Sequence, residues 1–202
     1  MDHVDESDAA LIAASLAQPG RFGPIFDRHA TVLHRYLVRR IGPDDADGLL
    51  GEIFRIAFEK RATYDPARPS ARPWLYGIAT NLVAKHRRSE ARRYYAVARL
   101  AARRVSGGPD LDEQVSAAVD AHDRWLRVAA AVAELPAPER DALILHVWEG
   151  LAYEEVASAL DVPVGTVRSR LNRARRRLRE PAAASGGQQV THDHRDPGRI
   201  GS

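Results

Sequence analysis

The chain has 202 residues, enough for one ordinary domain or two small ones, and its 30 Lys and Arg residues against 27 Asp and Glu residues leave a formal net charge of +3. With so mild a balance, any affinity for a polyanion must come from where the charges lie and not from their total. The absence of cysteine excludes disulfides, thiol catalysis and thiolate metal sites. Because the sequence shows no basic-apolar leader and no apolar run of membrane-spanning length, we expect a soluble cytoplasmic protein.

The first half of the chain repeats apolar side chains at helical spacing. Residues 22–41 place them at steps of three and four, which predicts a helix that ends at Gly42. A second apolar stripe predicts a helix from about residue 44 to just before Tyr64. The proline-rich segment 65–73 that follows is predicted to be a loop.

A third helix is predicted to begin near Arg72, with Pro73 in its first turn, and to run into the basic residues 85–88. No strand-like alternation occurs in this half. We therefore expect an N-terminal segment at 1–20 and a domain made only of helices at 21–104.

The second half begins after a break in the helical pattern. Ser, Gly and Pro gather near residue 107, so we expect a flexible linker over 105–119 and a second small helical domain over 120–180. Its predicted helices cover about 138–149, 152–160 and 164–179. A helix, a short turn and a longer basic helix form the helix-turn-helix pattern. The tail at 181–202 lacks periodicity and is expected to be disordered.

The last predicted helix carries seven arginines and a narrow apolar stripe. The stripe steps by three and four through Val164, Val167, Leu171, Ala174 and Leu178. A solvated helix usually interleaves acids, but none occurs here before Glu180, so the arginines repel one another unless a polyanion neutralises them. We therefore predict that the helix enters the major groove of DNA, with its N-terminal residues reading bases and its later arginines divided between phosphates and solvent.

A second candidate lies in the stretch RPWLYGIATNLVAKHRR, residues 72–88. Aromatic rings next to basic residues can stack on unpaired bases while the cations hold phosphates. A buried stripe of Trp74, Leu75, Ile78 and Leu82 explains the same pattern without a ligand. The stretch alone leaves both interpretations open.

Three stretches in order resemble the extracytoplasmic-function (ECF) class of bacterial sigma factors in the sigma-70 family. They read DDADGLLGEIFRIAFEKRATYD, RPWLYGIATNLVAKHRR and ELPAPERDALILHVWEGLAYEEVASALDVPVGTVRSRLNRARRRL. The resemblance spans residues 22–179 and implies two helical domains, usually called sigma-2 and sigma-4. It implies that the first binds the clamp of the largest subunit of core RNA polymerase and opens the −10 promoter element. The second is implied to bind the flap of the β subunit and to read the −35 element.

The resemblance also implies roles for individual residues. The base-facing −35 positions fall on Arg168, Ser169, Asn172 and Arg173, in agreement with helix geometry. Helix geometry adds further candidate −35 contacts, which are Arg170, Arg175, Arg176 and Arg177. The −10 surface, which receives a flipped base, falls on Trp74, Tyr76 and Asn81, with the basic residues Lys85, Arg87 and Arg88 beside it. The contact with core polymerase falls on Asp47, Leu50, Glu52 and Phe54. No catalytic residue, cofactor or metal is implied, and an anti-sigma protein is a common partner in the family.

Two departures from the family's pattern carry expectations. Gly48 and Gly51 stand where the family usually has an acidic residue and a glutamine, so two polar contacts with core polymerase are missing. Each glycine inside a helix also costs about 1 kcal/mol of helix stability relative to alanine. We therefore expect this protein to bind core polymerase more weakly. Ala152 stands where Ser or Thr commonly caps a helix, and its methyl group cannot accept a hydrogen bond.

Other functions have weaker support. A helix-turn-helix regulator, whose first domain is a sensor or a dimerisation module, is the competing interpretation. The acidic residues Asp44, Asp45, Asp47 and Glu52 lack a nucleophile or a histidine partner in the sequence pattern, so we do not predict an enzyme. The His192-Asp193-His194 segment of the tail is a weak metal candidate.

Overall fold

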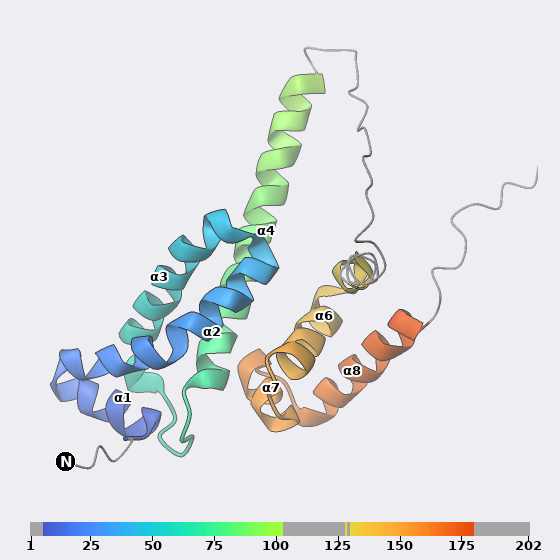
Figure 1. Cartoon of the computed structure of the whole chain (residues 1–202). Coiled ribbons are helices and arrows are strands. Elements are labelled where there is room, and N and C mark those ends of the chain that lie inside the picture. The colour runs from blue at the N-terminus through green and yellow to red at the C-terminus, as the bar shows by residue number, and fades with distance from the viewer. Residues whose placement is uncertain (1–5, 103–127, 129, 180–202) are drawn as a thin grey trace, which may run out of the picture.

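The structure is a computed structural model in which residues 6–102, 128 and 130–179 are described (Figure 1). Within those residues every regular element is helical, which confirms the predicted all-α class. None of the described helices is both long enough and apolar enough to cross a membrane. The predicted linker at 105–119 and the predicted tail at 181–202 lie outside the described residues, as does the His192-Asp193-His194 segment.

The first lobe, residues 6–102, is a helical bundle. It consists of α1 (Asp8–Ala17), a 3-10 turn (Pro19–Phe22), α2 (Gly23–Ile41), α3 (Pro43–Lys60), a 3-10 turn (Arg61–Thr63) and α4 (Arg72–Ala102). In Figure 1, α2, α3 and α4 lie side by side, α1 closes one end, and α4 extends well past the other end. Gly42 has φ +87 and ends α2 where the sequence predicts, because a left-handed backbone conformation suits a residue without Cβ.

Helix α1 is absent from the sequence-based prediction for residues 1–20. Its start is capped by Ser7, whose side chain accepts a hydrogen bond from the backbone N–H of Ala10 at 3.2 Å. Leu11 and Ile12 are buried in the core of the first lobe. The N-terminal segment from residue 8 is therefore part of the first lobe.

The buried carboxylate of Asp8 fastens α1 to the rest of the lobe. It lies 2.7 Å from Nε2 of His29 on α2 and accepts a hydrogen bond from the backbone N–H of Ala71, just before α4, at 2.8 Å. Burial by itself raises the pKa of Asp8, but the hydrogen bonds from His29 and Ala71 outweigh it and lower this pKa to about 2.

The second lobe comprises the described residues from 128 to 179. It consists of a helical segment at 130–134, α6 (Ala137–Leu143), a π turn (Ile144–Trp148), α7 (Tyr153–Leu160) and α8 (Val164–Arg179). The three predicted helices of this lobe are confirmed within one or two residues at each end. Asp161 has φ 51 and makes the tight turn between α7 and α8, which completes the predicted helix-turn-helix. Helix α7 lies against α4 of the first lobe, and α8 lies on the outer side (Figure 1).

Candidate nucleic-acid and polymerase interface

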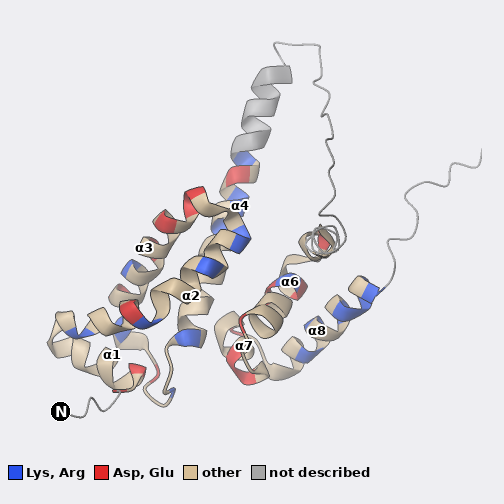
Figure 2. Ribbon diagram, in the orientation of Figure 1, with Lys and Arg blue, Asp and Glu red and all other residues tan. Residues whose placement is uncertain are grey.

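Helix α8 presents a basic face above a buried apolar stripe. Val167, Leu171 and Ala174 are buried against α6 and α7, as the spacing predicts. Figure 2 shows basic residues along the length of α8. The exposed residues of this face are Arg168, Asn172, Arg173, Arg176, Arg177 and Arg179, and Ser169, Arg170 and Arg175 are half-buried. The stripe thus decides which side of α8 is available to a nucleic acid.

Local bonds orient several of the predicted DNA contacts. Glu139 of α6 is buried, and its two carboxylate oxygens each lie 3.1 Å from an Nε atom, one of Arg173 and one of Arg177. Both guanidinium groups are therefore anchored on one carboxylate, a relation that the sequence conceals because Glu139 lies 34 residues before Arg173. The Ser169 hydroxyl donates to the carbonyl oxygen of Thr166 at 2.9 Å, so only its oxygen is available to accept from a base.

The predicted −10 surface contains a pocket of about 390 Å³. Trp74 and Asn81 of α4 both line it, because residues seven positions apart lie on the same face of a helix. Trp74 is half-buried, with its ring edge-on to Tyr64 at a centroid distance of 5.2 Å, and Asn81 is exposed. An aromatic wall and a side-chain amide can stack on a planar base and hydrogen-bond to its edge.

Tyr76 does not share this pocket. It lies two residues after Trp74, about 200° around the helix, and its side chain is fully buried between the two lobes. Its hydroxyl donates to Oε2 of Glu149 at 2.5 Å. Burial raises the pKa of Tyr76, and the Glu149 carboxylate raises it further, so the phenol remains a donor. The predicted contact of Tyr76 with DNA cannot form in this conformation.

The polar and basic residues of α4 divide into three groups. Thr80 is buried, and its hydroxyl lies 3.0 Å from that of Tyr36, which gives it a role in packing. Lys85 and Arg88 are exposed, as a phosphate contact requires. Arg87 instead turns towards α2 and donates to the carbonyl oxygen of Arg40 at 2.7 Å.

Buried polar contacts join the two lobes at Glu149, the residue after the π turn. Its side chain is 4% exposed and accepts hydrogen bonds from Tyr76 and Arg39, while its backbone carbonyl accepts one from Arg72. A second pair links Arg40 to Asp141 at 2.5 Å. The donors come from α2 and α4, and the acceptors belong to the second lobe.

A close backbone approach completes this contact. A Cβ atom built on Gly77 of α4 would lie 2.7 Å from the carbonyl oxygen of Ala159 in α7. Ser158 and Ala159 also line the pocket that holds Asn81. We call this arrangement, with α7 seated on Gly77 and Glu149 enclosed by the first lobe, the closed contact.

The residues predicted to meet core polymerase differ in exposure. On α3, Asp47 is exposed, Leu50 is half-buried, and Glu52 pairs with Arg55 at 2.6 Å. Phe54 is only 7% exposed and packs in the core of the first lobe, so its ring is not available to polymerase in this conformation, and its contact with polymerase stays a prediction.

The sequence pattern misses the aromatic residue that does reach this surface. Phe26 of α2 is 44% exposed and packs against Phe54 with a centroid distance of 4.7 Å and the ring planes tilted by 57°. Gly48 and Gly51 are on the exposed side of α3, where an added Cβ would meet nothing within 4 Å. The exposed side of the α2–α3 pair is therefore open to a partner.

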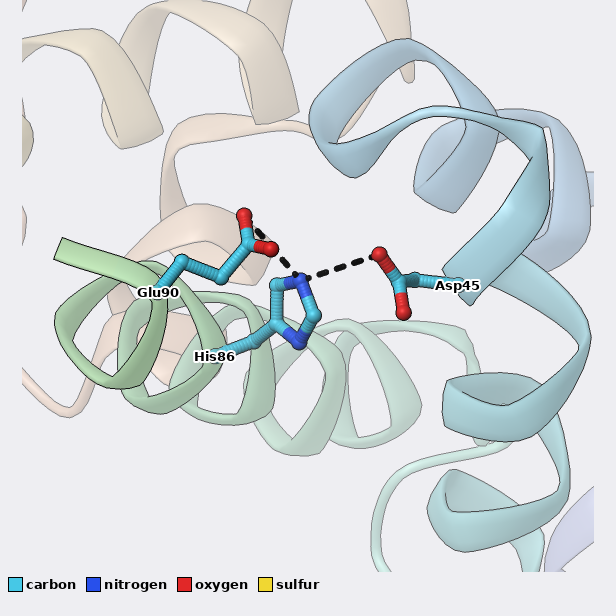
Figure 3. A group of neighbouring side chains, drawn as sticks. All are labelled: Asp45, His86 and Glu90. Atoms are coloured by element: carbon cyan, nitrogen blue, oxygen red, sulfur yellow. Dashed lines mark ion pairs between the residues drawn. The ribbon is translucent and has the colours of Figure 1, made fainter. Parts of the chain in front are cut away.

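A cluster of Asp45, His86 and Glu90 joins α3 to α4 (Figure 3). Nε2 of His86 lies 3.4 Å from Asp45 and 3.5 Å from Glu90, and the three ligand atoms lie within 4.8 Å of one another. Such groups can hold a metal ion, yet both carboxylates are about half-exposed or more. We interpret the cluster as a polar contact between His86 and the two carboxylates that ties the two helices together.

Comparisons with known proteins agree with this architecture. Family models match twice: "Sigma-70 region 2" over residues 25–93 and "Sigma-70, region 4" over residues 125–178. The chain is 33% identical to the ECF RNA polymerase sigma factor SigL of Mycobacterium tuberculosis strain H37Rv over 175 residues, which covers 85% of this chain and 94% of SigL.

Two solved structures share the fold. One is CnrH in complex with the cytosolic domain of CnrY, with a TM-score of 0.58 and 24% identity over 85% of this chain and 94% of that one. The other is the sigma factor RpoE with the anti-sigma factor NepR from Bartonella quintana, with a TM-score of 0.57 and 22% identity over 80% and 96%. The two matched regions and the identity to SigL show that the chain belongs to the ECF class of the sigma-70 family, the sigma factors that direct RNA polymerase to promoters at transcription initiation.

Proposed function

We propose that this sigma factor reads the −35 element through the exposed face of α8 and holds a flipped base of the −10 element in the pocket of Trp74 and Asn81. One observation carries the proposal: a single chain presents both a basic recognition helix and a pocket with an aromatic wall and an exposed amide. A flipped base loses a few kcal/mol of stacking and pairing, which the pocket can offset without any chemistry by the protein.

The same proposal requires the lobes to separate. Positions −35 and −10 are about 25 base pairs apart, or roughly 85 Å of B-DNA at about 3.4 Å per base pair. In the closed contact, Ala159 lines the pocket and α8 begins at Val164, five residues later, so the chain between them spans at most about 18 Å. The closed contact therefore cannot engage both elements at once.

We further propose that the exposed side of α2 and α3 docks on the polymerase clamp and that the second lobe docks on the β flap. Asp47, Leu50 and the exposed ring of Phe26 offer a mixed acidic and apolar surface of the kind that protein partners bind. As a polymerase subunit the protein acts in the cytoplasm and needs no catalytic group of its own. The co-crystal of RpoE with NepR supports an anti-sigma protein as a further class of partner.

Run-off transcription from a promoter library tests this proposal. Purified core polymerase is assayed with and without the protein, and initiation is expected to depend on it. Asn81→Ala is expected to reduce open-complex formation roughly tenfold through the loss of a hydrogen bond to the flipped base, with −35 duplex binding unchanged. Asn172→Ala is the reciprocal control, expected to weaken duplex binding. Initiation that is independent of the protein while duplex binding persists supports a helix-turn-helix regulator instead.

A further inference from the structure

Four arginines converge on a second pocket, between the lobes. It has a volume of about 280 Å³ and is lined by Arg39, Arg40, Arg87, Arg140, Val132, Ala133, Ile144 and Trp148. The first three arginines come from α2 and α4, while Arg140 and the apolar residues belong to the second lobe. A cavity of this size is near the lower end of the range, about 300–1,000 Å³, that holds small molecules.

The arginines of this pocket outnumber their acidic partners. Arg39 is paired with Glu149 and Arg40 with Asp141. Within the described part of the chain, Arg87 and Arg140 form hydrogen bonds only to backbone carbonyls, of Arg40 in the first case and of Ala133 and Leu135 in the second. Among the described residues, four positive charges against two negative ones leave a surplus of two.

Several of these arginine nitrogens are buried and have no hydrogen-bond partner in the part of the chain that the structure describes. The Arg40 side chain is 4% exposed, and its Nε and Nη1 atoms have no hydrogen-bond partner among the described residues, nor has Nε of Arg140. A buried guanidinium N–H group that lacks a hydrogen-bond acceptor destabilises the fold unless a further acceptor reaches it. Burial lowers the pKa of Arg87 and Arg140, and the nearby charge of Arg40 lowers both further, so these cations repel one another.

We propose that this pocket binds a small phosphorylated molecule with at least two negative charges, whose phosphates meet the arginines and whose apolar part lies against Ile144 and Trp148. Guanidinium groups bind phosphate through paired, charge-assisted hydrogen bonds, and several are needed for a multiply charged ligand. The aliphatic and indole side chains of the second lobe supply a surface that inorganic anions do not use.

The ligand would stabilise the closed contact. Because the site takes arginines from both lobes, it is complete only when they are in contact, so the ligand binds the closed form better and shifts the population towards it. If the lobes must separate for promoter binding, the ligand inhibits initiation. This consequence depends on the proposed function, whereas the binding itself does not.

Binding of pyrophosphate to the full-length protein tests the site in the absence of polymerase and promoter. Calorimetric titrations are run at one ionic strength, balanced with KCl, and pyrophosphate is expected to bind more tightly than inorganic phosphate. Arg140→Gln is expected to weaken pyrophosphate binding roughly 10- to 100-fold through the loss of charge-assisted hydrogen bonds. Arg35→Gln on α2 and Arg168→Gln on α8 remove exposed charges outside the pocket, and less than twofold change is expected for either.

Gly77→Ala provides a second test that leaves every arginine in place. Its Cβ would press on Ala159 and separate the lobes, so pyrophosphate affinity is expected to fall in this variant as well. If Gly77→Ala binds pyrophosphate as tightly as the unaltered protein, one lobe holds the anion by itself, and the proposal is overturned. Arginines of α8 that contact DNA phosphates would give this result. Equal losses in Arg140→Gln and Arg168→Gln would also overturn it, because they indicate general attraction of the anion to basic surface.

Discussion

Gly77→Ala should open the closed contact while stabilising the helix that carries it. The added Cβ would lie 2.7 Å from the carbonyl oxygen of Ala159 and 3.4 Å from its carbonyl carbon, both backbone atoms that no rotamer change can move. Overpacking of this kind costs about 1–3 kcal/mol. The whole cost falls on the contact between lobes, so the ratio of open to closed protein is expected to rise roughly 5- to 150-fold. Within α4 itself, alanine is favoured over glycine by about 1 kcal/mol.

The assay is fluorescence energy transfer between one label on each lobe. Because the chain has no cysteine, single cysteines at the exposed residues Glu59 and Glu154 can carry the labels. Gly77→Ala is expected to lower the transfer efficiency and to raise promoter binding by the isolated sigma factor. Gly48→Ala is the matched control, since its Cβ meets open space on α3, and it should leave the transfer unchanged. The same transfer in both variants would refute the steric reasoning.

Three further predictions concern single side chains. Asp8→Asn should remove about 2 kcal/mol of stability at neutral pH, because the pKa of Asp8 in the folded protein, about 2, is below its ordinary value of 3.8. The carboxylate therefore stabilises the fold above pH 4, and this stabilisation is lost as the pH falls towards 2. Urea unfolding of both proteins between pH 2 and pH 7 measures the difference. Ala152→Ser should stabilise the second lobe by about 0.5–2 kcal/mol, measured in thermal melts. The Ala152 N–H already donates to the Glu155 carboxylate at 2.8 Å, and a serine hydroxyl would add the second hydrogen bond of the capping box by accepting from the backbone N–H of Glu155. Glu139→Gln should weaken −35 duplex binding in salt titrations, because a neutral amide holds Arg173 and Arg177 less firmly than the carboxylate that orients them now; unchanged binding would show that this anchoring is irrelevant to DNA.

The sequence predicts elements whose signal is local. The stripe of α8, the glycine that ends α2 and the proline in the first turn of α4 act within a few residues, and the structure confirms each of these boundaries. Helix α1 is the exception, because its alanine-rich stretch has only Leu11 and Ile12 as large buried residues and its stabilising carboxylate, Asp8, bonds to His29 and Ala71 far along the chain.

The parts of the candidate site that escape prediction depend on contacts distant in sequence. Tyr76 is next to the aromatic and basic residues of a plausible DNA surface, and nothing near it indicates that Glu149, 73 residues away, will bind its hydroxyl. Phe54 and Phe26 are equally apolar in the pattern, and only the packing of α2 on α3 decides which of them is exposed. Exposure within an apolar or aromatic run is therefore a tertiary property.

Gly77 connects these observations to the closed contact. A glycine in the middle of α4 destabilises that helix by about 1 kcal/mol relative to alanine, and nothing in the backbone of α4 requires it, since Gly77 has no positive φ. A Cβ atom at Gly48 or Gly51 would meet nothing within 4 Å, so packing does not explain why these two positions are glycine. At Gly77, in contrast, the carbonyl oxygen of Ala159 occupies the space that a side chain would need. The seating of α7 on α4 gives this glycine a structural reason, which indicates that the sequence is adapted to the closed contact.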